Sequence, residues 1–513
     1  MGNKRWHWAW AAAPLTLALL TVAGCDGTPD APAAEPTAAP STSTSAARSV
    51  ARVCANPGTG PAKAPAGAVT VDPAVVGDLA AKTKSSPAHT TFWLRPGKHR
   101  LVPDRFAQIV PKEGDRYLGA PGAVLDGGKK NQYAFTGTAR DVTIRYLTVQ
   151  HFVAPQNEGV VNHDSADGWV IEHTTIQDNS GAGLMAGAHQ RVRASCLRDN
   201  GQYGMNAYKG GGGITDLVVE DNEIVGNNTD GWERRQQGCG CTGGVKFWAV
   251  DGADVRGNWV HDNRGAGLWA DTDNNDFLIE NNVLDANDGP ALIYETSYNA
   301  VVRNNTIRRN NWVEGRRYAD RGDNFPYAAV YVSESGGEPR VRARTDKIDI
   351  YRNVLENNWS GITLWENADR FCNSPANTSS GDCTLLVKTT GRCAEPAIDK
   401  APLYSDCRWK TQRVDIHDNR FVLDKSVVQC TDLCDRMAVL SNYGTYPDWS
   451  PYKGEKVAEA ITRRQGNHWH DNVYLGPWQF VAHDPSQVLD FDEWQGMDYR
   501  QDTGSTLAPG AGD

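Results

Sequence analysis

Residues 265–305 read GAGLWADTDNNDFLIENNVLDANDGPALIYETSYNAVVRNN, and this stretch contains one short pattern twice. The first copy, GLWAD, ends at Asp271, and the second, PALIYE, ends at Glu295. An alternating apolar segment and then an Asn-Asn pair follow each copy. The second copy therefore lies one repeat after the first and places Glu295 where the first has Asp271.

The same unit recurs along most of the chain, from Asp141 onward. Equivalent asparagines are 36, 24 and 23 residues apart, at Asn222, Asn258, Asn282 and Asn305. A period near 23 residues, with three short strands in each turn, is what a parallel β-helix requires. A β-propeller has blades of ~40–50 residues and does not fit this spacing. We therefore predict an all-β fold, a right-handed, single-stranded parallel β-helix (a solenoid) with inserted loops.

The repeated asparagine is predicted to be structural. An asparagine at a corner accepts the left-handed backbone conformation, and its side-chain amide can bond to the equivalent asparagines of the coils above and below. Helical periodicity is nearly absent from the chain, which agrees with an all-β fold.

The N-terminus has the features of an export signal. Lys4 and Arg5 precede an apolar run that ends in LTVAGC at Cys25, and this ending resembles a bacterial lipobox. We predict a lipoprotein signal peptide at residues 1–24 and lipidation of Cys25, which would anchor the protein on the extracellular face of the cytoplasmic membrane. The alternative is an ordinary secretory signal with a chance cysteine.

The remaining boundaries follow from composition. Residues 25–48 are mostly Ala, Pro, Thr and Ser, which predicts a disordered tether. The β-helix is predicted at residues 49–480, with a Cys-rich insertion at residues 369–410, and a C-terminal cap and tail at residues 481–513. Two shorter insertions, at residues 229–244 and 312–326, are predicted to wall a binding groove.

The cysteine count also indicates export. Of 11 cysteines, ten remain when Cys25 is set aside, and an even number in an exported chain predicts disulfides. Four of them lie in the Cys-rich insertion, and Cys430 and Cys434 form a closely spaced pair. Cys239 and Cys241 are separated by one glycine, a spacing that favours two separate disulfides over a zinc site.

Aromatic and charged residues gather on one predicted outer face. Period-two alternation in the strand after each Asp-Asn corner separates inward from outward side chains. Aromatic rings stack on the apolar faces of sugars, and carboxylates between them can act on a glycosidic bond. The face predicts a polysaccharide or oligosaccharide substrate, bound by Tyr208, Lys246, Trp248, Trp269, Tyr331 and Trp365.

Asp271 and Glu295 are the predicted catalytic pair. Adjacent coils lie ~4.8 Å apart, so the two carboxyl groups should be roughly 5 Å apart. This separation is typical of a retaining glycosidase, because an inverting enzyme needs ~6.5–9.5 Å. Asp273 competes with Asp271 for the role of nucleophile if the strand stays regular past Asp271. The alternative is a solvated acidic pair without a role.

No cofactor and no metal are predicted. Residues 271–276 resemble the start of a calcium loop, but Asp276 and Asn282 stand where an EF-hand has Gly and Glu. A looser structural calcium site remains an alternative. The formal net charge of −10 argues against nucleic acid as a partner. The protein is expected to be a monomer.

The coils from about Asp141 to Asn358 resemble right-handed β-helix proteins that act on polysaccharides. The motif that ends at Asp271, followed one coil later by LIYETS around Glu295, is similar to glycoside hydrolase family 120, the β-helical β-xylosidases. In that family an Asp and a Glu on neighbouring coils are nucleophile and acid/base. The resemblance implies that Asp271 is the nucleophile and that Glu295 is the acid/base.

Two other functions fit the same fold. A polysaccharide lyase or epimerase acting on a uronic-acid glycan needs a base and cations that neutralise the uronate, for which Lys246, Arg303 and Arg308 are candidates. A non-catalytic carbohydrate-binding surface protein would use the aromatic residues alone.

Overall fold

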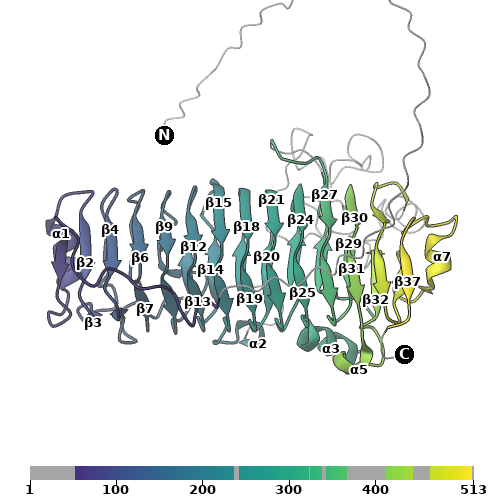
Figure 1. Ribbon diagram of the computed structural model, residues 1–513, viewed down its shortest axis with the longest axis horizontal. Helices are drawn as coiled ribbons and strands as arrows, with labels where there is room; N and C mark the ends of the chain where they lie inside the picture. Colours follow the sequence, from purple (N-terminus) through teal and green to yellow (C-terminus); the bar gives the residue numbers. More distant parts are fainter. Residues whose placement is uncertain are drawn as a thin grey trace, which may run out of the picture. The chain divides into compact units, whose positions relative to one another are not determined.

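The computed structural model describes residues 52–235, 242–322, 324–337, 342–366, 411–442 and 463–510. In this part of the chain three sheets of 13, 13 and 11 strands run side by side, and from β6 to β35 each turn of the chain contributes one strand to each sheet (Figure 1). The strands pair in parallel between successive coils, except for one antiparallel pair at the C-terminal end. The predicted parallel β-helix is confirmed.

Each sheet is a stack of short strands from successive coils. The first sheet contains β1 (Val69–Val71), β2 (Thr91–Leu94), β4 (Arg116–Gly119), β6 (Thr143–Arg145), β9 (Val170–Glu172), β12 (Arg191–Arg193), β15 (Ile214–Glu220), β18 (Val250–Arg256), β21 (Asn275–Glu280), β24 (Ala300–Arg303), β27 (Ile348–Tyr351), β30 (Val414–His417) and β33 (His468–His470). The second contains β3 (Gly97–Arg100), β5 (Ala123–Asp126), β7 (Thr148–Gln150), β10 (Thr175–Gln177), β13 (Cys196–Arg198), β16 (Glu223–Val225), β19 (Trp259–His261), β22 (Val283–Asp285), β25 (Thr306–Arg308), β28 (Val354–Glu356), β31 (Arg420–Val422), β34 (Val473–Leu475) and β37 (Thr506–Ala508).

The third sheet carries the predicted site. It contains β8 (Gly159–Val161), β11 (Ala182–Met185), β14 (Tyr203–Ala207), β17 (Gly243–Phe247), β20 (Ala266–Ala270), β23 (Leu292–Glu295), β26 (Val330–Ser333), β29 (Ile362–Glu366), β32 (Arg436–Asn442), β35 (Gln479–Val481) and β36 (Val488–Leu489). The side chains predicted to point inward from this sheet are buried. They are Leu184, Ala186, Met205, Ala207, Val245, Phe247, Leu268, Ala270, Leu292, Tyr294, Val330, Val332, Ile362 and Leu364.

The asparagine column forms a continuous hydrogen-bonded ladder inside the corner between the first and second sheets. Asn282 shows the pattern: its Nδ2 donates to Asn305 Oδ1 at 3.0 Å, and its Oδ1 accepts from Asn258 Nδ2 at 3.0 Å. The predicted structural role is confirmed. The ladder asparagine was expected to have the left-handed backbone, and this detail is wrong. The residue before it is left-handed instead, as at Asn281 with φ 57°.

A second ladder, which the sequence analysis did not separate from the first, runs along the corner between the second and third sheets. Its members bond through their amides in the same way: Asn179, Asn200, Asn227, Asn263, Asn287, Asn310 and Asn358. The two ladders fix the register of the coils on either side of the second sheet, so the third sheet is held in register with the other two.

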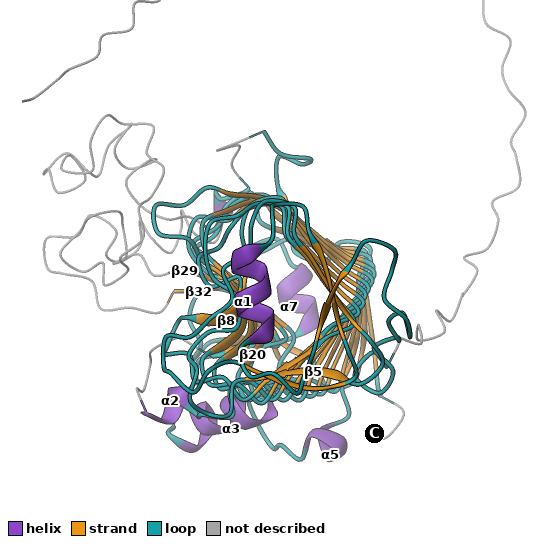
Figure 2. Cartoon of the chain, turned by 90° about the vertical axis from the view of Figure 1, so that its left-hand side faces the viewer, coloured by secondary structure: helices purple, strands orange, loops and turns teal. Residues whose placement is uncertain are grey.

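Helices cover both ends of the coil. Figure 2 shows α1 (Asp78–Ser85) across the N-terminal opening and α7 (Phe491–Gln495) at the other end. Leu79 of α1 is buried, and so is Trp494 of α7, whose ring stacks on Phe480 at 5.1 Å. Among the described residues, three further helices lie outside the coil: α2 (Trp232–Arg235), α3 (Trp312–Asp320) and α5 (Lys425–Val428). Strand β37 lies beyond residue 480, where the β-helix was expected to end.

Residues 52–61 form a segment that we call the N-terminal strap, which runs along the outside of the coil (Figure 1). At one end Arg52 lies 5.8 Å from the ring centroid of Trp259, and at the other Pro61 accepts a hydrogen bond from Trp93 Nε1. Between them a disulfide joins Cys54 to Cys196. The strap thus spans the coils from β19 back to β2.

The other cysteine predictions are partly covered by the described residues. Cys430 and Cys434 form a disulfide, in agreement with their spacing. The signal peptide, Cys25, the tether, Cys239, Cys241 and the Cys-rich insertion at residues 369–410 lie outside the described residues. Within the described ranges, no helix has the length and apolar character needed to cross a membrane.

A ladder of alternating charges lines the outer face of the first sheet. Opposite charges stack in register, for example Arg303 Nε with Glu280 at 2.8 Å and Arg256 Nε with Glu220 at 3.1 Å. The column reads Arg145, Glu172, Arg193, Glu220, Arg256, Glu280, Arg303, Tyr351, His417 and His470. The ladder therefore ends in His470, whose side chain can change its charge near neutral pH.

The stability of this end should depend on pH through His470. Burial lowers the pKa of His470, but the carboxylates of Asp471 and Asp415 outweigh it and leave the pKa raised. A raised pKa stabilises the fold below the unfolded value of about 6.5, and this contribution is lost as the pH rises through the folded value. His470→Gln should therefore remove part of the fall in unfolding free energy above about pH 6.5.

Urea unfolding at several pH values would measure this effect. His189→Gln is the matched control, because His189 is more exposed and its partner Asp216 is exposed as well. Identical pH profiles for wild type and His470→Gln would contradict the assignment.

Candidate functional site

The candidate residues lie on neighbouring strands of the third sheet, at the level of β17, β20 and β23. The register aligns Lys246 with Trp269 and aligns Trp269 with Ile293. Asp271 follows β20, and its backbone N–H donates to Phe247 O at 2.9 Å. Glu295 is the last residue of β23. The parallel register thus brings the two copies of the sequence pattern onto adjacent coils.

Lys246 and Asp271 form a partly buried ion pair. Nζ of Lys246 lies 2.8 Å from Oδ2 of Asp271, and each side chain is 14% exposed. The other carboxylate oxygen, Oδ1, accepts a hydrogen bond from Thr272 Oγ1 at 3.0 Å. Burial lowers the pKa of Lys246, but nearby Tyr203, Asp271 and Glu295 outweigh it, so the pKa is raised. The ammonium group therefore stays protonated at neutral pH.

The ring of Trp269 connects this ion pair to Glu295. Nζ of Lys246 lies 4.4 Å from the ring centroid, within the range of a cation–π contact. The indole Nε1 donates to Oε2 of Glu295 at 3.2 Å. One chain of contacts therefore runs from Asp271 through Lys246 and Trp269 to Glu295. The two carboxylates have different neighbours, a cation for one and an indole N–H for the other.

Asp273 occupies a turn instead of a strand. Strand β20 ends at Ala270, and Asp273 has a left-handed backbone at φ 59°. The alternation that would have put Asp273 on the outward side is therefore interrupted. Ser297, one coil later, donates to the backbone oxygen of Asp271.

Aromatic residues flank the carboxylates on both sides. Toward the N-terminal coils, the rings of Tyr208 and Trp248 meet edge to face at 6.3 Å, and Tyr208 is exposed. Toward the C-terminal coils, the rings of Tyr331 and Trp365 lie 6.1 Å apart. The structure thus divides the predicted sugar-binding residues into two groups, with Lys246 and Trp269 between them.

Two aromatic residues in this second group were missed. Phe325 and Tyr327 follow α3, and their rings lie 6.0 Å and 5.4 Å from that of Tyr331. The FPY run at residues 325–327, just before the strand that holds Tyr331, was the signal that could have found them. This segment also covers part of the sheet, since Thr363 is fully buried beneath it and donates to Pro326 O.

The electrostatic neighbourhood of Glu295 extends to this aromatic group. Burial and then the charge of Glu295 raise the pKa of Tyr331 well above its usual range. Burial also raises the pKa of Tyr327, with Glu295 among the smaller contributors. Both phenols therefore keep their protons, and each can act as a hydrogen-bond donor.

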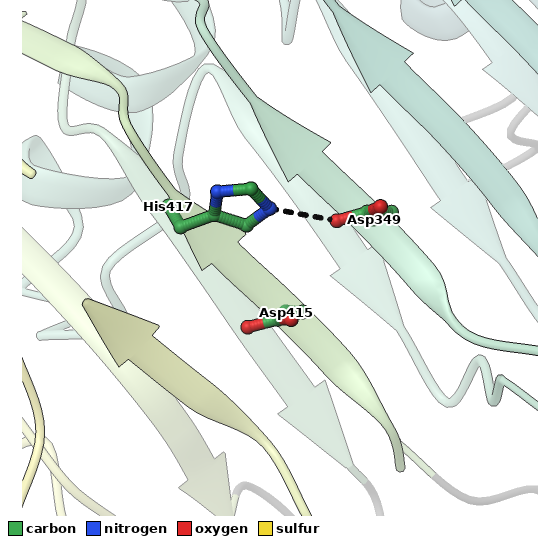
Figure 3. Close-up of side chains that lie close together, drawn as sticks. All are labelled: Asp349, Asp415 and His417. Atoms are coloured by element: carbon green, nitrogen blue, oxygen red, sulfur yellow. Dashed lines mark hydrogen bonds and ion pairs between the residues drawn. The ribbon is translucent and has the colours of Figure 1, made fainter. Parts of the chain in front are cut away.

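One further cluster has side chains of the kind that bind metal ions. Within the described residues, Asp349 of β27 and Asp415 and His417 of β30 approach one another on the outer face of the first sheet (Figure 3). However, Lys347 Nζ already lies 2.6 Å from Asp415 and 3.5 Å from Asp349, and His470 Nε2 lies 3.1 Å from Asp415. The two carboxylates are therefore already paired with Lys347 and His470, beside the C-terminal end of the charge ladder.

Comparison with known proteins agrees with the fold. A family model described as a right-handed β-helix region matches residues 158–346. No curated protein matches the chain. Among solved structures, the A-module of the Azotobacter vinelandii mannuronan C-5 epimerase AlgE4 is 12% identical, with a TM-score of 0.40 over 74% of this chain and 96% of the other.

Two other solved structures show similar likeness. The complex of XylC with xylose is 10% identical, with a TM-score of 0.34 over 75% of this chain and 55% of the other. Pectate lyase Pel9A is 12% identical, with a TM-score of 0.31 over 61% of this chain and 78% of the other. The part of the chain that carries Lys246, Trp269, Asp271 and Glu295 thus lies within the match to the right-handed β-helix model.

Proposed function

We propose that the protein is a glycan-active enzyme of the cell surface, a retaining glycoside hydrolase that uses Asp271 and Glu295. The observation that carries the proposal is the chain of contacts from Asp271 through Lys246 and Trp269 to Glu295. It holds two carboxylates on adjacent coils of an outer face, between two groups of aromatic residues.

The proposed reaction has two steps. In the first, Asp271 attacks the anomeric carbon while Glu295 gives its proton to the leaving oxygen, and a covalent glycosyl–enzyme forms. In the second, Glu295 takes a proton from water, which attacks the anomeric carbon and releases Asp271. Lys246 places a positive charge beside the carboxylate that leaves in the second step. Trp269 orients Glu295 through its indole N–H.

The aromatic groups on either side would hold the sugar units next to the cleaved bond. Tyr208 and Trp248 offer ring faces or edges on one side, and Tyr331 and Trp365 on the other. Sugar rings stack on such surfaces through their apolar faces. This arrangement supports a polysaccharide or oligosaccharide substrate that lies along the axis of the coil.

We also propose where in the cell the protein acts. The lipobox-like ending at Cys25 supports a lipid anchor on the extracellular face of the bacterial cytoplasmic membrane. We propose that the enzyme acts there as a monomer, without a cofactor, on glycans of the cell surface or its surroundings.

The stereochemistry of the product tests the reaction type. Turnover of a panel of aryl glycosides and cell-wall glycans, followed by proton NMR of the first product, should show the anomeric configuration of the substrate retained. At the ~4.8 Å spacing of adjacent coils, we expect the two carboxylates to be too close to leave room for the water of an inverting mechanism. Formation of the inverted anomer would contradict the proposed role of Asp271.

A lyase or epimerase is less well supported by the placement of the cations. Arg303 belongs to the charge ladder of the first sheet, and Arg308 pairs with Asp285 on the second sheet at 2.9 Å. Of the three cations considered, only Lys246 lies at the candidate site, and it is paired with Asp271. Unsaturated, ultraviolet-absorbing products from a uronic-acid glycan would favour a lyase over hydrolysis, and a uronic acid of inverted C5 configuration in an uncleaved glycan would favour an epimerase.

A further inference from the structure

A cavity of about 600 Å³ lies outside the coil, between α3 and α5. It is separate from the carboxylates of the candidate site. Helix α3 is fixed against the coil because Trp312 Nε1 donates to Asn357 O at 2.8 Å. Gly315 allows this close approach, since a Cβ there would lie 2.2 Å from the ring of Trp359. The cavity therefore has a rigid wall.

Three arginines of or next to α3 line this cavity, against one acidic residue. Arg316 is held in place because Nη2 donates to Val428 O at 3.1 Å. Arg321 lies 4.8 Å from the ring centroid of Tyr318, and its Nε donates to Arg317 O. The guanidinium of Arg317 has no hydrogen bond or ion pair with any residue in the described ranges. The acidic residue in the lining is Asp320.

This concentration of positive charge is unusual for the chain. The formal net charge of the whole protein is −10, yet three of the eight residues that line the cavity are arginines. Trp312 and Val313 add apolar surface beside them. Guanidinium groups form paired hydrogen bonds with carboxylate and phosphate groups, and neighbouring apolar surface strengthens such contacts.

The cavity is connected to the candidate site by aromatic residues. The ring of Tyr318 on α3 lies 4.9 Å from that of Tyr327, and Tyr327 lies 5.4 Å from Tyr331. Tyr331 in turn lies on β26, the strand that pairs with β23, at the end of which Glu295 lies. A glycan bound at the carboxylates could therefore extend along these rings toward α3.

We propose that the cavity between α3 and α5 binds an anionic substituent of the glycan, a carboxylate or a phosphate, with Arg317 and Arg321 as its main ligands. The proposal rests on the proposed glycan substrate and adds that this glycan carries negative charge away from the cleaved bond. The cavity is large enough for one or two sugar units, since ligand pockets typically measure about 300–1,000 Å³.

Binding of simple probes tests this site without requiring turnover. The Asp271→Asn/Glu295→Gln variant would be titrated with glucuronate, glucose 6-phosphate and glucose, and binding would be followed by saturation-transfer NMR. We expect saturable millimolar binding of at least one anionic probe, and binding of glucose at least about tenfold weaker. The two anionic probes distinguish a carboxylate from a phosphate ligand.

Arginine variants in the same background locate the site. Arg317→Gln/Arg321→Gln should weaken binding of the preferred anionic probe at least about tenfold. Arg116→Gln, which removes an exposed arginine of β4 far from α3, should leave binding unchanged. The proposal is overturned if neither anionic probe binds, if glucose binds equally well, or if the double arginine variant binds like its parent. Loss of hydrolysis as the proposed function would leave these binding results unaffected.

Discussion

Asp271→Asn and Glu295→Gln should each lower the turnover of a glycoside by roughly a thousandfold or more. Asparagine cannot form the covalent intermediate, so the first variant loses both steps of the reaction. Glutamine cannot donate or accept the proton, so the second loses acid and base assistance. The contacts of Asp271 with Lys246 and Thr272 hold the nucleophile in position, and an amide of the same size preserves most of that geometry.

The two variants should differ in a diagnostic way. Glu295→Gln should retain more activity on aryl glycosides with a good leaving group, because these need no protonation. Azide should restore part of its turnover and yield a glycosyl azide of retained configuration. Neither a good leaving group nor azide should restore the turnover of Asp271→Asn. This difference assigns the nucleophile and the acid/base without knowledge of the natural glycan.

Two comparisons complete this experiment. Asp273→Asn tests the rival residue and should keep most of the activity, since Asp273 lies in the turn after β20. Asp216→Asn removes an exposed acid from the first sheet and is the control for charge. Melting temperatures of all variants would show whether a loss of activity reflects unfolding. Full activity in both Asp271→Asn and Glu295→Gln would remove the proposed mechanism.

The disulfide between Cys54 and Cys196 should have the largest single effect on stability. It links residues 142 positions apart, and closing a loop of that length restricts the unfolded chain strongly. We expect Cys54→Ser/Cys196→Ser to lower the free energy of unfolding by about 2–5 kcal/mol. The loss would also release the N-terminal strap, whose other contacts lie on the surface of the coil.

The second described disulfide is the matched control. Cys430 and Cys434 are only 4 positions apart, so their bond restricts the unfolded chain much less. Urea unfolding of the two double-serine variants should therefore show the larger loss for the Cys54–Cys196 pair. Equal losses would mean that the long loop contributes nothing beyond local packing.

The repeat period was sufficient to predict the fold, because each coil repeats the same burial pattern. Residues such as Leu268 and Leu292 point inward in every turn, and their spacing shows it directly. The period also placed Asp271 and Glu295 on adjacent coils. It could not show that Arg303 and Arg308 lie on different sheets from Lys246, because that depends on where each corner turns.

Other features lay beyond sequence reasoning for specific physical reasons. The turn at Asp273 arises because Asp273 itself has a left-handed backbone. Aspartate adopts this conformation only occasionally, so the residue type alone does not predict it. The contacts of Phe325 and Tyr327 depend on how an insertion folds back over the sheet. The strap from Arg52 to Pro61 lacks alternation, and all its partners are distant in sequence.

The strap also has a consequence for the order of folding. Its residues precede every strand of the coil, but their partners at Cys196, Glu223 and Trp259 come much later in the sequence. The strap therefore cannot dock until the coils as far as β19 have stacked, and contacts of such long range form slowly. Each coil contacts mainly its two neighbours, so the β-helix can extend one coil at a time before the strap binds. Oxidation of Cys54 with Cys196 would then mark the completion of the N-terminal half and lock it after assembly.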